Sequence, residues 1–360
     1  MKLGIIGAGQ LARMLALAAY PLNIKCMFLD PNEKSCAASL GELLISNYDD
    51  QASIAKIAKE CDFVTYEFEN VSAQALESLA NLGAVAPSPR ALTVSSDRLL
   101  EKSLFKQLGI KTAAYSQVDS IADLEAAVDQ IGYPGILKSR HSGYDGKGQV
   151  VIRDRNDLVK AWSEIDKVSA IFEKMVDFSR EVSMIAVRSR RGEIRYYSLV
   201  ENVHENGVLK LSTVRLNDDM QTQAESFVQT LLEELDYVGV IALEMFQVGN
   251  ELVVNEFAPR VHNSGHWTIE GAITSQFENH VRAVTNLPIG DCSAVSPSAM
   301  VNLVGKLPAI EEILKVDGAN IHYYDKEPRA GRKVGHVTIC AEDNNALKSR
   351  LDSVLQVVNS

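Results

Sequence analysis

The thirteen residues 255–267 carry an unusually dense set of chemically active side chains within a sequence of 360 residues. They include the carboxylate of Glu256, the guanidinium of Arg260 and two imidazoles. The apolar run 252–254 precedes them, so we expect a buried strand whose carboxyl end opens into a site lined by ionisable groups. The simpler alternative is a solvated loop after an edge strand. The two differ in whether other parts of the chain supply partners.

Two glutamates, Glu244 and Glu256, lie on segments that we expect to form an antiparallel strand pair, 238–247 and 251–257. Facing carboxylates without a basic neighbour repel each other unless a cation lies between them. Magnesium, which bridges phosphate groups, is the natural cation for oxygen ligands. The sequence therefore predicts a metal site at these two residues; the alternative is two unrelated exposed acids.

This metal site makes a demand on strand register. Side chains directly opposite each other share one face of a sheet, so Glu244 must pair with Glu256, which we expect to need a three-residue loop such as 249–251. A two-residue turn at 249–250 would place the carboxylates on opposite faces. Asn255 is expected to add a neutral oxygen.

The segment 142–148 is rich in glycine and lies between predicted strands at 135–139 and 149–152. It is not a Walker A loop, because Lys147 is followed by glycine where that motif needs Ser or Thr. Backbone N–H groups of such a loop can approach phosphate oxygens, and Lys138 on the preceding strand supplies a positive charge. We therefore expect a lid over phosphate; the alternative is an ordinary surface hairpin.

The first thirty residues carry a dinucleotide-binding pattern. A strand over 3–6 leads into the turn 7–12, which opens a helix, and the next strand ends at Asp30 about 20 residues after the glycines. Taken alone, this pattern indicates an NAD-dependent oxidoreductase that uses Gly7, Gly9 and Asp30.

Alternating strands and helices up to the break at 87–89 predict an α/β fold that begins with a doubly wound parallel sheet. We expect strands over 3–6, 26–30, 62–66, 83–86, 135–139, 149–152, 170–174, 181–187, 195–200, 238–247, 251–257, 300–303, 320–324 and 335–340, and helices from 10, 97–108, 121–131 and 221–235. The composition shifts again at Asp291, where a small β-rich terminal unit begins.

The composition excludes several classes of protein. With 46% hydrophobic and 23% charged residues the chain is globular, and its net charge of −11 disfavours nucleic acid and anionic lipid as partners. The five scattered cysteines show no zinc-type spacing and are expected to be reduced. We find no signal peptide and no apolar run long enough to cross a membrane, so we expect a cytoplasmic protein.

Four motifs extend along the chain: GQLARM near the start, SGYDGKGQ at 142–149, NEFAPRVHNSGHWT at 255–268 and YDKEPRAGRKVGHV at 324–337. With Lys102, Lys138 and the two glutamates, they resemble ATP-grasp enzymes and in particular the N5-carboxyaminoimidazole ribonucleotide synthetases of purine biosynthesis. The last two motifs are long and specific, whereas the first is weak by itself.

The resemblance implies three domains, at 1–92, 93–290 and 291–360: a pre-ATP-grasp domain, an ATP-grasp domain of two α+β lobes with the lid at 142–148, and a small β-rich domain. It also implies an ATP ligase in which bicarbonate becomes carboxyphosphate and carboxylates the 5-amino group of 5-aminoimidazole ribonucleotide. Two Mg²⁺ ions and a homodimer are part of the same expectation.

The resemblance assigns residues to three groups. The ATP site would comprise Arg98, Lys102, Lys138, Ser142, Gly143, Gly146, Lys147, Gly148, Gln149, Glu173, Val176, Glu181, His204 and Asn255, with Glu244 and Glu256 on metal. The substrate site would comprise Gln10, Glu67, Glu69, Tyr144, Asn263, Ser264 and Arg332. The candidate catalytic residues are Asp145, Arg260, His262 and Lys333.

The expected roles within these groups are distinct. Arg260 and His262 would steady bicarbonate and carboxyphosphate, and Asp145 would steer the proton of the substrate amine. Lys333 and Arg332, together with the turn at 9–10, would meet the substrate phosphate.

Several alternatives stay open. Glu67 and Glu69 are equal candidates for contact with the imidazole. His266, Trp267 and His336 are unassigned, whereas Trp162, His280 and His322 are expected to be structural. The rival functions are another ATP-grasp ligase, an NAD-dependent oxidoreductase and a nucleotide sensor. In the family that the motifs resemble, the N-terminal domain does not bind NAD.

Overall fold

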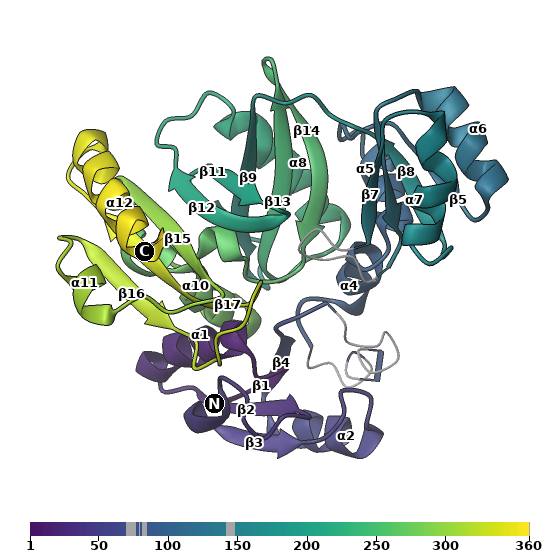
Figure 1. The fold of residues 1–360 in the computed structure, drawn as a ribbon. Helices are drawn as coiled ribbons and strands as arrows, with labels where there is room; N and C mark the ends of the chain where they lie inside the picture. Colours follow the sequence, from purple (N-terminus) through teal and green to yellow (C-terminus); the bar gives the residue numbers. More distant parts are fainter. Residues whose placement is uncertain (70–76, 79, 81–84, 142–147, 360) are drawn as a thin grey trace.

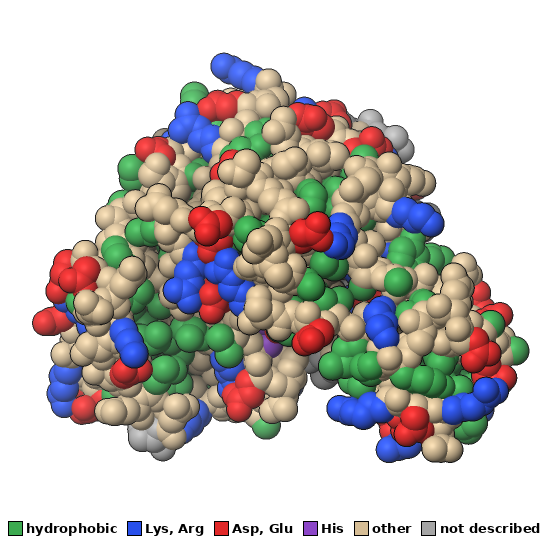
Figure 2. All heavy atoms as spheres, turned by 90° about the horizontal axis from the view of Figure 1, so that it is seen from above, with side chains coloured by type: hydrophobic (Ala, Val, Ile, Leu, Met, Phe, Trp, Pro, Cys, Tyr) green, Lys and Arg blue, Asp and Glu red, His purple; other side chains and the backbone are tan. Residues whose placement is uncertain are grey.

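The computed structural model describes residues 1–69, 77–78, 80, 85–141 and 148–359. Figure 1 shows the N-terminal part at the bottom, a lobe at the right, and a large central sheet that continues into the C-terminal part at the left. Seen from above, the right-hand lobe stands out from the body, and basic and acidic side chains lie intermixed on that face (Figure 2).

The N-terminal part is a parallel sheet in the order β3-β2-β1-β4. Its elements are β1 (Lys2–Ile6), α1 (Gln10–Ala19), η1 (Tyr20–Leu22), β2 (Lys25–Asp30), η2 (Ala38–Leu40), β3 (Glu42–Ile45), α2 (Gln51–Glu60) and β4 (Phe63–Tyr66). Apolar side chains fill both faces of β1 and β2, as expected for a sheet covered by helices on two sides. The predicted parallel sheet is confirmed. Of the strand expected over 83–86, Val85 makes an isolated bridge to Val64, and 83–84 lie outside the described residues.

The right-hand lobe is an antiparallel sheet in the order β5-β8-β6-β7. It comprises β5 (Tyr115–Val118), α6 (Ile121–Ile131), β6 (Gly135–Ser139), β7 (Gln149–Ile152), η3 (Arg155–Asp157), α7 (Leu158–Glu164) and β8 (Ala170–Lys174), and follows the helices α4 (Pro89–Ser95) and α5 (Arg98–Gln107). Ser120 caps α6 through the backbone N–H of Asp123, as the capping motif predicts. Trp162 packs in the core of this lobe.

The central sheet has the order β14-β13-β9-β11-β12-β15-β17-β16, with β10 paired to β9. Its elements are β9 (Arg180–Arg188), β10 (Ile194–Tyr196), β11 (Val200–Glu205), β12 (Val208–Val214), α8 (Gln221–Glu234), β13 (Gly239–Val248), β14 (Glu251–Ala258), η4 (Asn263–Gly265), α9 (Thr268–Gly271), α10 (Gln276–Val284), β15 (Ser298–Val304), α11 (Ile310–Leu314), β16 (Ala319–Tyr323), β17 (Lys333–Cys340) and α12 (Asn344–Asn359). The C-terminal strands therefore extend the central sheet through the pairing of β12 with β15.

One sequence expectation is wrong here, and other elements were missed. The strand expected over 195–200 divides into β10, which ends at Tyr196, and β11, which begins at Val200 and pairs with the other end of β9. The hairpin β11–β12 and helix α12 were not predicted. Short strands of mixed polarity, such as β11, carry no clear alternation, so periodicity does not identify them. None of the helices within the described residues has the length and apolar character needed to cross a bilayer.

A buried histidine ties the N-terminal part to the central sheet. His280 of α10 accepts the backbone N–H of Val240 on Nδ1 at 3.1 Å, and its Nε2 lies 2.9 Å from Thr65 Oγ1 of β4. Because Nδ1 is the acceptor, Nε2 carries the hydrogen and donates to Thr65. Burial lowers the pKa of His280 to about 3, so the ring stays neutral near pH 7. The structural role expected of His280 agrees with this position.

Replacing Thr65 by valine tests this tie. Thr65→Val removes the hydroxyl and leaves the His280 Nε2–H buried without its partner, so we expect a loss of about 1–3 kcal/mol in the free energy of unfolding. Urea denaturation at pH 7 measures the change. The control Thr222→Val, at an exposed position of α8, should stay within about 0.5 kcal/mol of the original protein. Equal effects of the two substitutions would contradict the tie.

Candidate active site

A cavity of about 680 Å³ lies where the three parts of the molecule meet. Its walls come from the start of α1, the end of β4, the helix α5, the strands β13 and β14, and the C-terminal residues Tyr324 and Lys333. The sequence-predicted residues that line it are Gln10, Glu67, Glu69, Arg98, Lys138, Gln149, Glu181, His204, Glu244, Asn255, Glu256, Arg260, His262, Asn263 and Lys333. The stretch that follows β14 thus does find partners from distant parts of the chain.

In the strand pair β13–β14, Glu244 pairs with Glu256 as expected, but the loop that joins the strands differs from the prediction. Val248 pairs with Glu251, so the turn holds two residues, and the predicted three-residue loop is wrong. Glu244 nevertheless pairs with Glu256, because the register shifts by one residue at a β-bulge and Asn255 is left over. A bulge sets two residues of one strand opposite one residue of the other. Asn255, Glu256 and Glu244 therefore all line the cavity.

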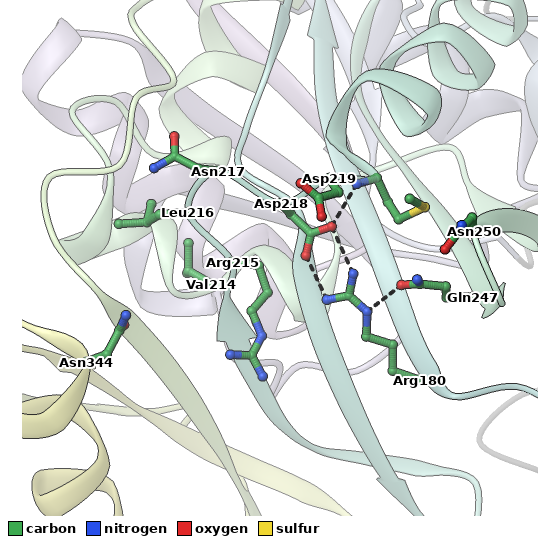
Figure 3. A pocket seen from close by; sticks show the side chains of 11 residues that line it. Arg180, Val214, Arg215, Leu216, Asn217, Asp218, Asp219, Gln247, Asn250 and Asn344 are labelled. Carbon is green, nitrogen blue, oxygen red and sulfur yellow. Dashed lines mark hydrogen bonds and ion pairs between the residues drawn. The ribbon is translucent and has the colours of Figure 1, made fainter.

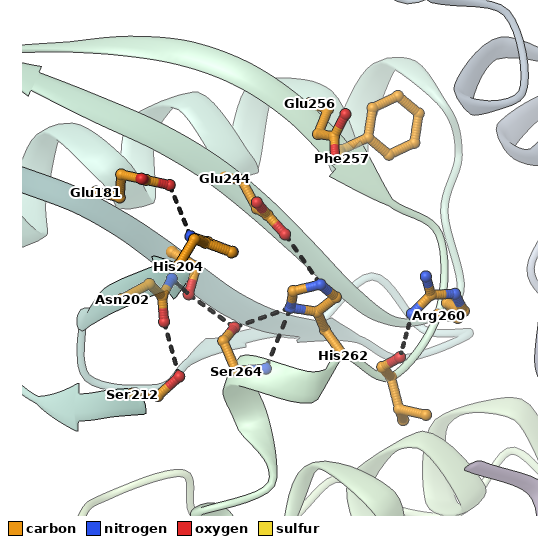
Figure 4. Close-up of polar contacts among 12 residues, drawn as sticks. Glu181, Asn202, His204, Ser212, Glu244, Glu256, Phe257, Arg260, His262 and Ser264 are labelled. Atoms are coloured by element: carbon orange, nitrogen blue, oxygen red, sulfur yellow. Dashed lines mark hydrogen bonds and ion pairs between the residues drawn. The ribbon is translucent and has the colours of Figure 1, made fainter. Parts of the chain in front are cut away.

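Both carboxylates of this pair have basic partners. Arg98 of α5 lies 2.8 Å from Glu256. His262 Nε2 lies 2.9 Å from Glu244 (Figure 4). The sequence argument assumed that the two acids have no basic neighbour, and this assumption is wrong. It failed because Arg98 and His262 are distant from their acids in the sequence. Burial alone would raise the pKa of Glu244, but the hydrogen bond and charge of His262 outweigh it and lower that pKa.

The donor set at the bulge fits a hard divalent cation. Two carboxylates and one amide side chain line one wall of the cavity, and oxygen ligands of this kind suit Mg²⁺. Among the described residues, no group of three or more His, Cys, Asp or Glu gathers in a way that could hold a metal by itself. A two-carboxylate set is the kind that Mg²⁺ uses when phosphates and waters complete its shell.

A buried charge cluster lies behind this wall. Glu173 of β8 is 2.6 Å from Lys138 of β6 and 3.3 Å from Lys102 of α5, and all three side chains are less than a tenth exposed. Burial would raise the pKa of Glu173, but the two ammonium groups lower it to about 2. Burial lowers the pKa of Lys102, whose ammonium also donates to the carbonyl of Asn255 at 2.8 Å. Lys138 lines the cavity, whereas Lys102 and Glu173 do not.

The glycine turn of the N-terminal part is filled by a side chain. Glu67 accepts backbone N–H groups of Gly9 and of Ala12, the latter at 2.8 Å. A Cβ at Gly9 would lie 2.6 Å from Glu67 Oε1, so glycine is needed for the approach of this carboxylate. Asp30 accepts the N–H of Ala8 at 2.9 Å. The place where a pyrophosphate would bind is therefore occupied, which overturns the NAD-dependent alternative.

The same contact concerns the expected substrate site. The turn at 9–10 is expected to bind a substrate phosphate, and Glu67 accepts the amide hydrogen of Gly9 in this turn. The two acids left undecided by the sequence have different surroundings. Burial raises the pKa of Glu67, whereas Glu69 forms an ion pair with Arg260 at 2.9 Å. Both line the cavity.

The candidate catalytic histidine belongs to a buried polar chain. His262 Nδ1 lies 2.9 Å from Ser264 Oγ, which in turn lies 2.7 Å from Ser183 Oγ of β9 (Figure 4). Ser264 is fully buried, so it orients His262 instead of lining the cavity. Nearby, His204 Nδ1 lies 2.8 Å from Glu181, and this acid, together with Glu244, raises the pKa of His204 against the opposing effect of burial.

Other predicted residues do not reach the cavity. Gly148, Val176 and Arg332 are described but do not line it. The predicted residues Ser142, Gly143, Tyr144, Asp145, Gly146 and Lys147 lie outside the described residues.

Sequence reasoning missed several residues of the wall. Phe178 and Phe246 stack with centroids 4.7 Å apart and give the cavity an apolar face. Glu101 of α5 also lines it. Lys326 hydrogen-bonds Gln10, so the C-terminal motif touches the start of α1. Lys326 belongs to the motif at 324–337, so the sequence could have indicated this residue. Its contact with Gln10 is seen only in the structure.

Three residues left unassigned by the sequence have defined places. His266 lines the cavity and packs 4.9 Å, between ring centroids, from the buried His336. Tyr324 lies 2.7 Å from His336 Nδ1. Burial lowers the pKa of both histidines well below the usual range. Trp267 is fully buried and does not line the cavity.

A second hollow, of about 320 Å³, lies near the loop that follows β12 (Figure 3). Arg180 holds Asp218 there with two bonds of 2.7 and 2.8 Å, and Arg215 pairs with Glu201. The charges of this hollow thus compensate one another. It contains none of the sequence-predicted site residues.

Comparison with known families matches three domain models along the chain. A ribonucleotide synthetase preATP-grasp domain matches residues 1–96, an ATP-grasp domain matches 103–277, and a phosphoribosylaminoimidazole carboxylase C-terminal domain matches 298–350. The second match spans the right-hand lobe and the strands β9 to β14 of the central sheet, and the third begins at β15 and includes β17.

Individual proteins are similar over the whole chain. The N5-carboxyaminoimidazole ribonucleotide synthase of Pseudomonas aeruginosa is 48% identical over 100% of both chains. The crystal structure of the synthetase from Thermus thermophilus has a TM-score of 0.95 and 46% identity, covering 99% of each chain. The synthase of Aspergillus clavatus in complex with ADP and 5-aminoimidazole ribonucleotide has a TM-score of 0.92 and 31% identity, covering 99% and 98%.

The charge cluster at Glu173 generates a prediction about stability and pH. Glu173→Gln leaves the buried Lys102 and Lys138 without their acid, so we expect a loss of about 3–5 kcal/mol at pH 7. The folded pKa of about 2 lies below the ordinary 4.5, so this stabilisation is complete above about pH 4.5 and is lost as the pH falls toward 2. The difference between Glu173→Gln and the original protein should therefore shrink at acid pH.

Urea denaturation at pH 7, 5 and 3 measures this difference. The control is Glu125→Gln, an exposed position of α6, which should change little at any of these pH values. A Glu173→Gln effect that is the same at pH 7 and pH 3 would show that the carboxylate charge is not what stabilises the cluster.

Proposed function

The chain belongs to the N5-carboxyaminoimidazole ribonucleotide synthase family of ATP-grasp ligases, and we propose that it uses ATP and bicarbonate to carboxylate the 5-amino group of 5-aminoimidazole ribonucleotide. The γ-phosphoryl group of ATP passes to bicarbonate, giving carboxyphosphate and ADP. Carboxyphosphate then delivers its carboxyl carbon to the amine, releasing phosphate. This is a step of purine biosynthesis.

The observation that carries this proposal is the composition of the cavity. One continuous space brings together the acids of the β13–β14 pair, the basic side chains of Arg260 and His262, and the start of α1. A nucleotide, an inorganic anion and an imidazole ribonucleotide therefore have adjoining walls of suitable chemistry.

We assign the nucleotide to the side of the cavity between the lobe and the central sheet. Lys138 meets its phosphates as a point charge, with Lys102 behind it. The apolar face made by Ile136, Phe178 and Phe246 suits the adenine base. Gln149 and His204 remain assigned to the same ligand.

We assign magnesium to Glu244, Glu256 and Asn255. When bound there, Mg²⁺ would neutralise phosphate charge in the phosphoryl-transfer step. The chain's own contribution is to hold two carboxylates on one face through the bulge. The number of ions is proposed as two.

We assign bicarbonate and carboxyphosphate to Arg260 and His262. His262 is held by Glu244 on Nε2 and by Ser264 on Nδ1, so its ring has a fixed orientation. Arg260 is held by Glu69. A fixed guanidinium and a fixed ring N–H stabilise anionic charge that develops during acyl and phosphoryl transfer.

We assign the imidazole ribonucleotide to the wall shared by the N-terminal and C-terminal parts. Gln10, Asn263 and Lys333 line this wall. Lys326, which contacts Gln10, is added as a cation for the substrate phosphate, alongside Lys333 and Arg332. Asp145 and Tyr144 remain the proposed lid contacts.

We also propose that the enzyme is a cytoplasmic homodimer. All five cysteines are free, which suits a reducing compartment. On and just after α1, Leu17 is 48% exposed and Tyr20 is 83% exposed. Exposed apolar side chains one helical turn apart support an interface there.

Formation of ADP tests the reaction. With bicarbonate present, 5-aminoimidazole ribonucleotide should stimulate ADP release, and N5-carboxyaminoimidazole ribonucleotide should appear in equal amount. Equal stimulation by formate or by unrelated amines would favour another ATP-grasp ligase instead. ATP binding without turnover would indicate a nucleotide sensor.

The metal assignment has its own test. Glu256→Gln removes one carboxylate of the proposed pair and should lower kcat/KM roughly 100-fold, on the order of the loss expected when a metal site is weakened. The matched control Glu251→Gln lies on the same strand, where Glu251 forms an ion pair with the exposed Lys111, and should keep full activity. Full activity of Glu256→Gln would refute the assignment.

Sedimentation velocity tests the dimer. The protein should sediment as a species of twice the monomer mass. Tyr20→Lys should raise the dimer dissociation constant about tenfold or more, because an aromatic side chain buried in the proposed interface is replaced by a charge. The control Lys25→Ala changes a nearby exposed charge and should leave the dimer intact. A monomer at every concentration would exclude the proposal.

A further inference from the structure

Two neighbouring residues of helix α5 hold the bulge of strand β14. Lys102 Nζ donates to the carbonyl of Asn255 at 2.8 Å. Glu101 Oε1 accepts the backbone N–H of Phe257 at 2.7 Å. The two contacts lie on either side of Glu256 along the strand, so α5 grips the backbone before and after this residue.

The contact made by Glu101 is costly to lose. A bulge interrupts the ladder of a sheet, and a buried backbone N–H next to it needs another acceptor. Glu101 borders the cavity but is only 2% exposed, so its oxygen is largely shielded from water. β14 lies at the edge of the central sheet, and Glu101 supplies an acceptor to this edge strand.

The position of Glu256 depends on this backbone. The turn of two residues would direct Glu256 away from Glu244 in a regular strand pair, and the register shift at Asn255 reverses that. The direction in which Glu256 leaves the strand is therefore set by the local geometry of the bulge. Glu101 acts on that geometry from outside the sheet.

We propose that Glu101 is a positioning residue for the metal site: its carboxyl oxygen fixes the backbone at Phe257 and so holds Glu256 on the face of Glu244. The inference rests on the proposed metal role of Glu244 and Glu256. In the proposed role, Glu101 acts through the backbone of β14 and not through a contact with the nucleotide or the substrate.

The role needs an oxygen acceptor. Glu101 meets the strand through one oxygen, Oε1, which accepts the N–H of Phe257. The side-chain amide of glutamine offers a carbonyl oxygen that accepts in the same way. Glutamine should therefore replace Glu101, whereas side chains without an oxygen at this distance should not.

Three substitutions separate the acceptor from the charge. Glu101→Gln keeps the oxygen, Glu101→Met keeps the length but has no such acceptor, and Glu101→Asp keeps the carboxyl group but withdraws it by one methylene. The control Leu104→Ala removes a buried side chain of the same helix without touching the bulge contact.

Binding of Mn²⁺ in the presence of ADP, followed by electron paramagnetic resonance, is the principal measurement. We expect Glu101→Gln to stay within about twofold of the original protein, and Glu101→Met and Glu101→Asp to bind Mn²⁺ about 10–100-fold more weakly, as for residues that orient metal ligands. Leu104→Ala should lower the melting temperature but keep the Mn²⁺ affinity.

Hydrogen exchange supplies a second measurement that does not depend on the metal. A peptide containing Phe257 should exchange faster in Glu101→Met and Glu101→Asp than in Glu101→Gln. The Mg²⁺ concentration that gives half-maximal ADP formation should rise in the same two variants. If Glu101→Met does not fold, Glu101→Asp carries the comparison.

Three results would overturn the inference. Faster exchange at Phe257 with unchanged Mn²⁺ affinity would show that the contact does not position the metal site, while the proposed function would stand. A loss in Glu101→Gln as large as in Glu101→Met would assign the effect to charge. Failure of the original protein to bind Mn²⁺ with ADP would remove the metal role and the inference with it.

Discussion

Acidic and basic side chains are paired across the cavity, and this pairing is the constraint on which the rest of the site depends. Lys138 is held by Glu173, Arg98 by Glu256, Arg260 by Glu69 and His262 by Glu244. A phosphate group that bound without a cation would draw the basic side chains away and leave their carboxylates unpaired, which is costly for the buried Glu173. A nucleotide that arrives with its metal brings both signs, so each side chain exchanges one opposite charge for another. The acids and bases are therefore matched to a charged pair of ligands.

The strand pair β13–β14 shows how far sequence reasoning goes. Residue types at 244 and 256 were sufficient to predict that the two glutamates face each other, and they do. The loop predicted from that demand was wrong, because an alternation of period two does not register one extra residue in mid-strand. The bulge is held by contacts from α5, more than 150 residues away in sequence. The pattern of residues near the strand pair does not indicate contacts from such distant residues.

The N-terminal glycine turn shows the opposite case, in which a local pattern is real but its usual meaning is not. The strand, turn and helix were predicted correctly, and the sheet is parallel as expected. The ligand at the helix start is Glu67 of the chain itself, supplied just after β4. A carboxylate and a phosphate satisfy the same amide donors. The motif therefore indicates that an anionic group binds at the helix start. Only the fold shows whether this group is a side chain of the protein or a ligand.

The path of the C-terminal strands completes the site. From sequence, the last seventy residues form a separate β-rich unit, yet β15 pairs with β12 and carries the central sheet onward. Because β17 lies beyond β15 in that sheet, its first residue, Lys333, is delivered to the cavity by strand pairing alone. The loop before it sends Lys326 to Gln10. A substrate wall shared by the two ends of the chain is complete only when both ends are folded onto the central sheet, which couples assembly of the substrate site to the whole fold.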